Sequence, residues 1–485
     1  MQASQKHEIC YGSVQTLESY HSSLAQTIES CSTSNSNPDL SSPSANGSPV
    51  LNSYMLKTQN SFESCLTQTQ DIDDLSHKLH ELETAMLGPD EEISVAYDAD
   101  AVMYEAERWK KTTEMISRGD LKEMLCACAH AMEENDMETS EWLISELRQM
   151  VSISGNPLQR LGAYALEALV ARLSSSGSKI CKSLKCREPT ASELLSYMNK
   201  LYEICPYFKF GYLSANGVIA DAMKQENKVH IIDFQINQGI QWVSLIRALA
   251  CRPGGPPTIR ITGVDDSASA FTRGGGLEIV GKRLSALAQS CNVPFQFLAM
   301  EVSASDVDFQ HLKILPGEAI AVNFTMMLHH LQDETMERLL RLVNCLCPKV
   351  VTLVEQESDT NHVPFYPRFV QTLNYYLPVF ESIDDVMARD HRDRINVEQH
   401  CLAREIVNLI ACEGEDRVER HETLETWRSR FRMAGFGPYP LNSFINFTIK
   451  NLLEDYSKNY TLLEKDGALY LGWMNHPLVS SCAWR

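Results

Sequence analysis

The chain has 485 residues, of which 44% are hydrophobic and 22% are charged. These proportions are typical of a soluble globular protein, and no apolar run approaches the ~18 residues of a membrane-spanning helix. The formal net charge is −20 at pH 7, which opposes binding to nucleic-acid phosphates unless a local basic groove overcomes it. The composition therefore excludes a membrane protein and disfavours a direct DNA binder.

The cysteines and the first residues indicate in which cellular compartment the protein is expected. The 15 cysteines are an odd number, and their placement forms no disulfide framework. We therefore expect reduced thiols in a cytoplasmic or nuclear protein. The first ten residues, MQASQKHEIC, lack the basic-then-apolar pattern of a signal peptide, so we expect no secretion.

Residues 1–70 are dominated by Ser, Thr, Gln and Asn. Such a segment buries too little apolar surface to offset the entropy of ordering it, so we predict a disordered tail. Residues 1–92 contain 3 basic and 13 acidic residues. Half of the net charge is thus in this N-terminal part, and the folded part is less acidic than the total suggests.

An amphipathic helix is predicted over residues 71–88, within a helix-and-linker region that spans 71–117. Leu75, Leu79, Leu82 and Met86 recur at helical spacing, and Gly88-Pro89 is a stop signal. The helix either docks a partner or packs onto the domain, and the sequence leaves both alternatives open.

Residues 118–228 show helical patterns throughout and predict a helical cap. Three capping boxes are expected at Asp120/Glu123, Asn156/Gln159 and Thr190/Glu193. Leucines recur along 121–173 in runs too short for a coiled coil, so packing within the domain is favoured over a free zipper. Cys126 and His130 lie four residues apart, but without a second ligand pair nearby a core role is favoured over zinc binding.

Residues 229–485 alternate between strands and helices and predict an α/β core. We expect strands at residues 229–234, 258–264, 295–301, 319–325 and 350–355, and helices at 240–250, 277–290 and 333–347. Asp466-Gly467, between two alternating runs, predicts a hairpin. A doubly wound, mainly parallel sheet that ends in an antiparallel hairpin is the topology of class I methyltransferases, a likeness that does not by itself carry function.

The turn at residues 234–239 follows the first strand, where such folds bind their cofactor. Of its residues only Gly239 is small, and Phe234 and Ile236 occupy the approach. Asp265 follows the second strand and could accept a ribose hydroxyl, but the segment 323–326 lacks the Pro-Pro-aromatic step of amino methyltransferases. One of three features is present, so we predict no cofactor.

Other chemistries have weaker support. The sequence contains no GxSxG, HExxH or GxxxxGK[ST] motif. His329-His330 beside Asp333 could bind a metal, but adjacent histidines on a helix point in different directions, so no metal site is predicted. The segment 273–276, Arg-Gly-Gly-Gly, could meet an anion, but a flexible loop is favoured.

Residues 229–242, VHIIDFQINQGIQW, match almost letter for letter the signature of the plant GRAS family of transcriptional regulators. Further segments resemble the family's motifs in the family's order. They are the two leucine-rich regions (121–173 and 277–331), a Pro, Phe-Tyr and Arg-Glu region (364–380 with Arg404-Glu405), its continuation at 417–431, and the closing SSCAWR (480–485). The segments ELETAMLGPD and LYLGWMNHPLVSSCAWR look most like the scarecrow-like branch named for phytochrome A signal transduction.

This resemblance implies a methyltransferase-like core with a helical cap, and a nuclear location that can include the cytoplasm. It implies a non-enzymatic regulator of transcription in development, light or hormone signalling. The implied partners are other GRAS proteins, as homo- or heterodimers, and DNA-binding proteins such as zinc-finger factors, with DNA contacted mostly indirectly. The family motifs contain the residues that we expect to matter for structure or partner binding: His230, Asp233, Asn237, Gly239, Trp242, Pro364, Arg404, Glu405, Trp427 and Trp484.

Several of these residues have an expected role. Asp233 and Asn237 should cap backbone N–H groups of the strand–helix turn, and His230 should face the helices that cover the sheet. Trp242 should pack its helix on the sheet. Trp484 should be buried with an acceptor for its indole N–H.

The charged residues near the C-terminal motifs have two interpretations. Arg404, Glu405, Arg417, Glu419 and Arg420 form either a solvated surface or a buried ion-pair network, and the network is slightly favoured because apolar residues surround them.

Two alternatives to a protein-binding regulator stay open. One is an enzyme that uses S-adenosylmethionine. The other is a direct DNA binder, which needs a basic groove. Arg389, Arg392, Arg394 and Arg404 are its candidates, but Asp390 and Asp393 interleave with them.

Overall fold

The structure is a computed structural model that describes residues 110, 113–115, 117–174, 189–266 and 276–485. Residues 111–485 form one compact unit, to which every element described below belongs. The predicted tail (1–70) and amphipathic helix (71–88), and most of the predicted loop at 273–276, lie outside the described residues. Among those residues, no helix is both long and apolar enough to cross a membrane.

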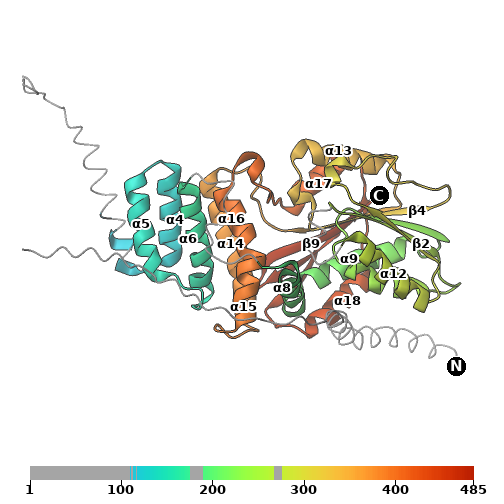
Figure 1. Cartoon of the computed structure of the whole chain (residues 1–485), viewed down its shortest axis with the longest axis horizontal. Coiled ribbons are helices and arrows are strands. Elements are labelled where there is room, and N and C mark those ends of the chain that lie inside the picture. Colours follow the sequence, from blue (N-terminus) through green and yellow to red (C-terminus); the bar gives the residue numbers. More distant parts are fainter. Residues whose placement is uncertain (1–109, 111–112, 116, 175–188, 267–275) are drawn as a thin grey trace, which may run out of the picture. The chain divides into compact units, whose positions relative to one another are not determined.

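Three helices stand side by side at the start of this unit: α4 (Leu121–Glu133), α5 (Met137–Met150) and α6 (Pro157–Leu173) (Figure 1). The capping box at Asn156/Gln159 closes in both directions and starts α6. Asp120 caps α4 by accepting the backbone N–H of Glu123, but the Glu123 side chain meets Arg118 instead of returning to the cap. This predicted capping box is therefore only half formed.

Two more helices lead to the sheet, α8 (Ala191–Ile204) and α9 (Tyr207–Ala222). The capping box at Thr190/Glu193 is complete and starts α8. Helix α9 packs on β4, β5 and β9 of the sheet. Gly211 allows this contact, since a Cβ there would lie 2.8 Å from Val354.

The sheet has nine strands, and its main path runs β3-β2-β1-β4-β5-β9-β8-β7. Its first five strands in sequence pair in parallel: β1 (Lys228–Asp233), β2 (Thr258–Val264), β3 (Phe295–Met300), β4 (Ala319–Thr325) and β5 (Val350–Gln356). The predicted strands are confirmed to within one residue at each end, and the order is that of a methyltransferase-like fold.

The remaining strands are antiparallel. Strand β9 (His476–Trp484) lies between β5 and β8 (Ala468–Trp473), and β7 (Tyr460–Lys465) forms the edge. The short β6 (Pro438–Tyr439) pairs with the end of β9. Asp466 and Gly467 turn the β7–β8 hairpin with φ of 53° and 75°, so the predicted hairpin is confirmed.

Helices cover both faces of the sheet (Figure 1). One core contains α9, α10 (Ile240–Ala250), α12 (Leu277–Ser290) and α18 (Ser443–Glu454). The other core contains α13 (Asp333–Cys345) and α17 (Leu424–Met433). The alternation of side chains along β1 follows this division, because Val229 and Ile231 join the first core and Ile232 joins the second.

Helices α14 (Phe365–Asp384) and α16 (Ala403–Ala411) pack against the first three. Both pack on α6, and α14 also packs on α4 (Figure 1). Between them in sequence, α15 (Arg392–Val397) and the π-helical turn η4 (Glu398–Leu402) pack on α8. These contacts cross the expected boundary at residue 229, as do those of α9 with the sheet.

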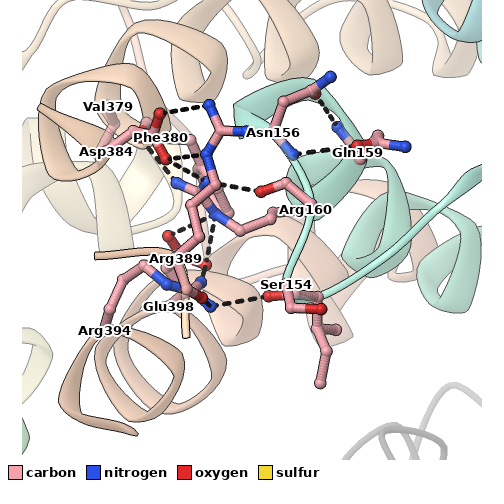
Figure 2. A network of polar contacts seen from close by, with 12 residues as sticks. Ser154, Asn156, Gln159, Arg160, Val379, Phe380, Asp384, Arg389, Arg394 and Glu398 are labelled. Atoms are coloured by element: carbon pink, nitrogen blue, oxygen red, sulfur yellow. Dashed lines mark hydrogen bonds and ion pairs between the residues drawn. The ribbon is translucent and has the colours of Figure 1, made fainter. Parts of the chain in front are cut away.

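A buried arginine of α6 connects the two sets of helices (Figure 2). The Arg160 Nε donates to both carboxylate oxygens of Glu398, at 3.0 and 3.2 Å. Its other nitrogens donate to Asp384 at 2.7 Å and to the carbonyls of Gly155 and Phe380 at 3.0 and 3.1 Å. Arg160 and Glu398 are both fully buried. A buried ion pair is stable only if its N–H donors have acceptors within the protein.

Arg394 completes this network. It donates to Glu398 and to the carbonyls of Ile153 and Arg389, and the Arg389 side chain donates to Asp384 at 3.0 Å. Buried carboxylates are thus matched by guanidinium groups from segments more than 200 residues apart in sequence. The network specifies how the first helices dock on α14 and η4.

We expect Arg160→Ala to lower the free energy of unfolding by about 3–5 kcal/mol, because it leaves Glu398 buried with one partner fewer. Urea denaturation followed by circular dichroism measures this. The control is Arg148→Ala, an exposed arginine of α5, which should change the free energy by less than about 0.5 kcal/mol. Equal effects of the two substitutions would contradict the role given to the network.

Candidate functional site

Asp233 ends β1 and is 2% exposed. Its Oδ2 accepts the indole N–H of Trp242 at 2.8 Å, and its Oδ1 accepts the side-chain amide of Asn323 at 3.1 Å and the backbone N–H of Gln235 at 3.3 Å. Burial raises the pKa of this carboxyl to about 6, although the three hydrogen bonds lower it. Asp233 thus joins β1, the following turn, α10 and β4.

Asn323 of β4 extends these bonds through the sheet. Its Oδ1 accepts from Gln241 at 3.1 Å and from Thr352 of β5 at 2.9 Å. Gln241 in turn contacts Asn216 of α9, whose amide donates to the Gln241 carbonyl at 2.7 Å. All of these side chains are buried, so the network is satisfied internally.

The turn itself depends on left-handed backbone at Asn237 (φ 49°) and Gly239 (φ 68°). A Cβ at Gly239 would also lie 2.7 Å from Val280 of α12. Both the left-handed backbone and the lack of space therefore require glycine at this position. Helix α10 has Gly239 as its N-cap, which supplies no side-chain hydrogen bond. The Asn237 amide donates to the carbonyl of Gln235 at 3.2 Å, and the expected capping of turn N–H groups by Asn237 stays a prediction.

Apolar side chains fill the turn. Phe234 is 2% exposed and stacks on Phe324 with ring centroids 5.1 Å apart. Ile236 is 3% exposed and packs so closely on Gly263 of β2 that a Cβ there would lie 2.8 Å from it. The space between the ends of β1 and β2 is therefore occupied by the chain's own side chains.

His230 lies on the opposite face of β1 from Asp233 and contacts polar groups of neighbouring segments. Its Nε2 is 2.8 Å from the Thr262 hydroxyl, and its Nδ1 is 3.1 Å from Arg260 and 3.3 Å from Glu318. These contacts are with β2 and with Glu318 before β4, and the expectation that His230 faces the covering helices stays a prediction. Burial, aided by Arg260 and opposed by Glu318, lowers the pKa of His230 to about 4.

The other motif residues are spread over the fold. Pro364 precedes α14, where its fixed φ of −57° suits a helix start. Trp427 and Trp484 are buried, and Trp484 stacks on Phe431 at 5.0 Å. The indole N–H of Trp427 meets no hydrogen-bond acceptor among the described residues. The Trp484 indole interacts with the Cys482 thiol, and the acceptor expected for Trp484 stays a prediction.

The five charged residues do not form the ion-pair network that was favoured. Arg404 is exposed, and Glu405 accepts the hydroxyl of Tyr376 at 2.6 Å. Arg417 and Arg420 donate to backbone carbonyls, and Glu419 approaches histidines. Their partners are neutral groups and histidines because the loop 417–422 folds back toward the ends of β4 and β5.

A cluster of histidines and glutamates lies at the ends of β4 and β5, and it was not predicted from the sequence. The Nδ1 of His329 lies 2.6 Å from Glu355 of β5, and its Nε2 lies 3.3 Å from Glu419. His330 and His421 approach the same Glu419 carboxylate at 3.5 and 3.4 Å. Burial alone would lower the pKa of His329, but Glu355 and Glu419 raise it to about 10.

The sequence suggested a metal site formed by His329, His330 and Asp333, but it predicted that the two histidine rings point in different directions. Both rings face one carboxylate, with centroids 4.1 Å apart, because they lie on a 3-10 turn (Leu328–His330). Asp333 belongs to a different group, which is formed with His362 and Glu422. In the sequence, the two adjacent histidines are a sign of this cluster. Glu419 and His421 lie some 90 residues further on, so no local pattern connects them with His329.

Comparison with known proteins gives consistent results. The model of the GRAS domain family matches residues 121–485. The chain is 59% identical over 434 residues to the scarecrow-like transcription factor PAT1 of Arabidopsis thaliana, which covers 87% of this chain and 88% of that protein. It is 57% identical over 458 residues to the chitin-inducible gibberellin-responsive protein 2 of Oryza sativa subsp. japonica, covering 93% and 82%.

The crystal structure of SCL7 from Oryza sativa has the same fold. It superimposes with a TM-score of 0.68 at 34% sequence identity, over 76% of this chain and 99% of that chain.

Asp233→Ala should lower the free energy of unfolding by about 3 kcal/mol, because the buried donors of Trp242, Asn323 and Gln235 lose their acceptor. Chemical denaturation measures the loss. Asp390→Ala, which removes an exposed carboxyl, is the control and should be nearly neutral. An unchanged melting temperature in Asp233→Ala would show that the carboxylate does not hold the turn.

His230 should make stability depend on pH. Its pKa is about 4 in the folded chain and about 6.5 when unfolded. Its contribution is therefore complete above pH 6.5 and is lost as the pH falls toward 4. Between pH 7.5 and 5.5, wild type should lose about 1 kcal/mol more stability than His230→Gln. The exposed His476→Gln should follow wild type, and parallel curves for wild type and His230→Gln would contradict the assignment.

Proposed function

The chain belongs to the GRAS domain family and is a plant transcriptional regulator, and we propose that it acts without catalysis, as an adaptor for DNA-binding proteins. The partners that we infer are other members of the family and DNA-binding factors such as zinc-finger proteins. The setting is light or hormone signalling in the nucleus, with a cytoplasmic fraction.

The apolar side chains that fill the turn after β1 support the proposal that the chain acts without catalysis. In open α/β sheets the cofactor approaches backbone at this turn. Here Phe234 and Ile236 occupy that position and belong to the hydrophobic cores. A cofactor could enter only if these side chains left the cores, at a cost of about 1.5–3 kcal/mol each.

Of the four arginines that could form a basic groove, two already bond to carboxylates of this chain. Arg394 is fully buried in the network around Glu398, and Arg389 pairs with Asp384. Arg392 and Arg404, like Arg389, are exposed. Three exposed arginines, one of them paired with Asp384, supply little counterion release, which supports indirect over direct binding to DNA.

Helix α18 offers a surface for a protein partner. Ile445 and Ile449 face the core, whereas Phe444 and Phe447 are 59% and 53% exposed. The two phenylalanines are three residues apart and therefore lie on one face of the helix. Exposed aromatic side chains are enriched where proteins bind each other.

The purified chain should bind a GRAS or zinc-finger partner, and Phe444→Ser/Phe447→Ser should weaken this binding at least tenfold, or about 1.4 kcal/mol. Isothermal titration calorimetry measures the affinity. Met433→Ser, which removes another exposed apolar side chain (76% exposed), is the matched control and should leave binding unchanged.

Two results would contradict the adaptor proposal. One is tight, sequence-specific binding of the chain alone to DNA at physiological salt, measured by fluorescence anisotropy. The other is saturable heat on titration with S-adenosylmethionine, which would indicate an intact cofactor site.

A further inference from the structure

We propose that His329, His330 and Glu419 form a binding site for a divalent transition-metal ion, of which zinc fits the ligands best. The ligand atoms of His329, His330 and Glu419 all lie within 4.8 Å of one another. Imidazole nitrogen and carboxylate oxygen are both ligands that zinc accepts, with four-coordination in structural sites.

The spacing of these atoms fits a tetrahedral site. Zinc–nitrogen distances are about 2.0–2.1 Å, which places the corners of a tetrahedron about 3.3 Å apart. The Nε2 of His329 lies 3.3 Å from the Oε2 of Glu419, and the Nε2 of His330 lies 3.5 Å from the Oε1 of the same carboxylate. One ion between these three side chains could therefore bind them with small adjustments and leave one corner of the tetrahedron open.

His421 lies beside the site without belonging to it. It is 1% exposed, and its Nε2 contacts the Oε2 of Glu419 at 3.4 Å. This contact helps to hold the Glu419 carboxylate toward His329 and His330.

The residues around the site orient its ligands. Glu355 bonds to the Nδ1 of His329 at 2.6 Å, which leaves the Nε2 facing Glu419. Zinc-binding histidines commonly donate their second nitrogen to a carboxylate in this way. Glu355 is itself held by the backbone N–H groups of Met327 and Leu328, at 3.1 and 2.8 Å.

The second acidic group of this region lacks these features. Asp333, His362 and Glu422 also lie close together, but the Arg430 guanidinium donates to Asp333 at 2.7 Å and to Glu422. That group already holds a cation. Around Glu419 the nearby Arg420 side chain turns away to the carbonyls of Val418 and Gly414.

The full chain, stripped with a chelator and dialysed against zinc, should retain about one ion in this site and melt at a higher temperature than the metal-free chain. His330→Gln should lower zinc affinity at least tenfold. Glu355→Gln should lower it by about 10- to 100-fold through His329. The exposed His476→Gln is the matched control and should bind as wild type does.

Cobalt substitution separates this site from the cysteines. The site should give the visible absorption of tetrahedral Co²⁺ without a thiolate-to-metal band, and His330→Gln should remove it. No uptake of zinc by wild type, or uptake unchanged by both variants, would overturn the proposal.

Discussion

The sheet depends on one buried carboxylate that accepts hydrogen bonds from three directions. Asp233 receives N–H groups from Trp242, Asn323 and the turn, and through Asn323 it is linked to Thr352 and Gln241. Five elements thus meet in a buried network. A strand–helix junction that other α/β proteins leave open to a ligand is here closed by internal polar bonds on one side and by Phe234 and Ile236 on the other.

The carboxyl edge of the sheet also holds a second concentration of polar groups. They lie at the ends of β4 and β5, where His329 and Glu355 meet Glu419 and His421. In this fold the edge collects side chains because parallel strands all end there.

Most of the sheet could be predicted from the sequence, because its strands are short apolar runs between strong turn signals. Helices α10 and α12 and the hairpin at Asp466-Gly467 follow from equally local patterns. What local patterns cannot give is the partner of Arg160, which lies 238 residues away, or the pairing of Glu419 with His329. The polar neighbours of His230 on β2 could not be predicted either, since the strand's alternation fixes its face but not what lies beside it.

The position of β9 has a consequence for how the chain is made. This strand follows every other element of the sheet in sequence, yet it lies between β5 and β8 and pairs Trp484 with Val351. During synthesis β5 therefore emerges from the ribosome long before its neighbour, with an open edge and apolar faces. The sheet can close only after translation has passed Trp484, so a chaperone that covers the β5 edge in the meantime would protect the nascent chain from aggregation.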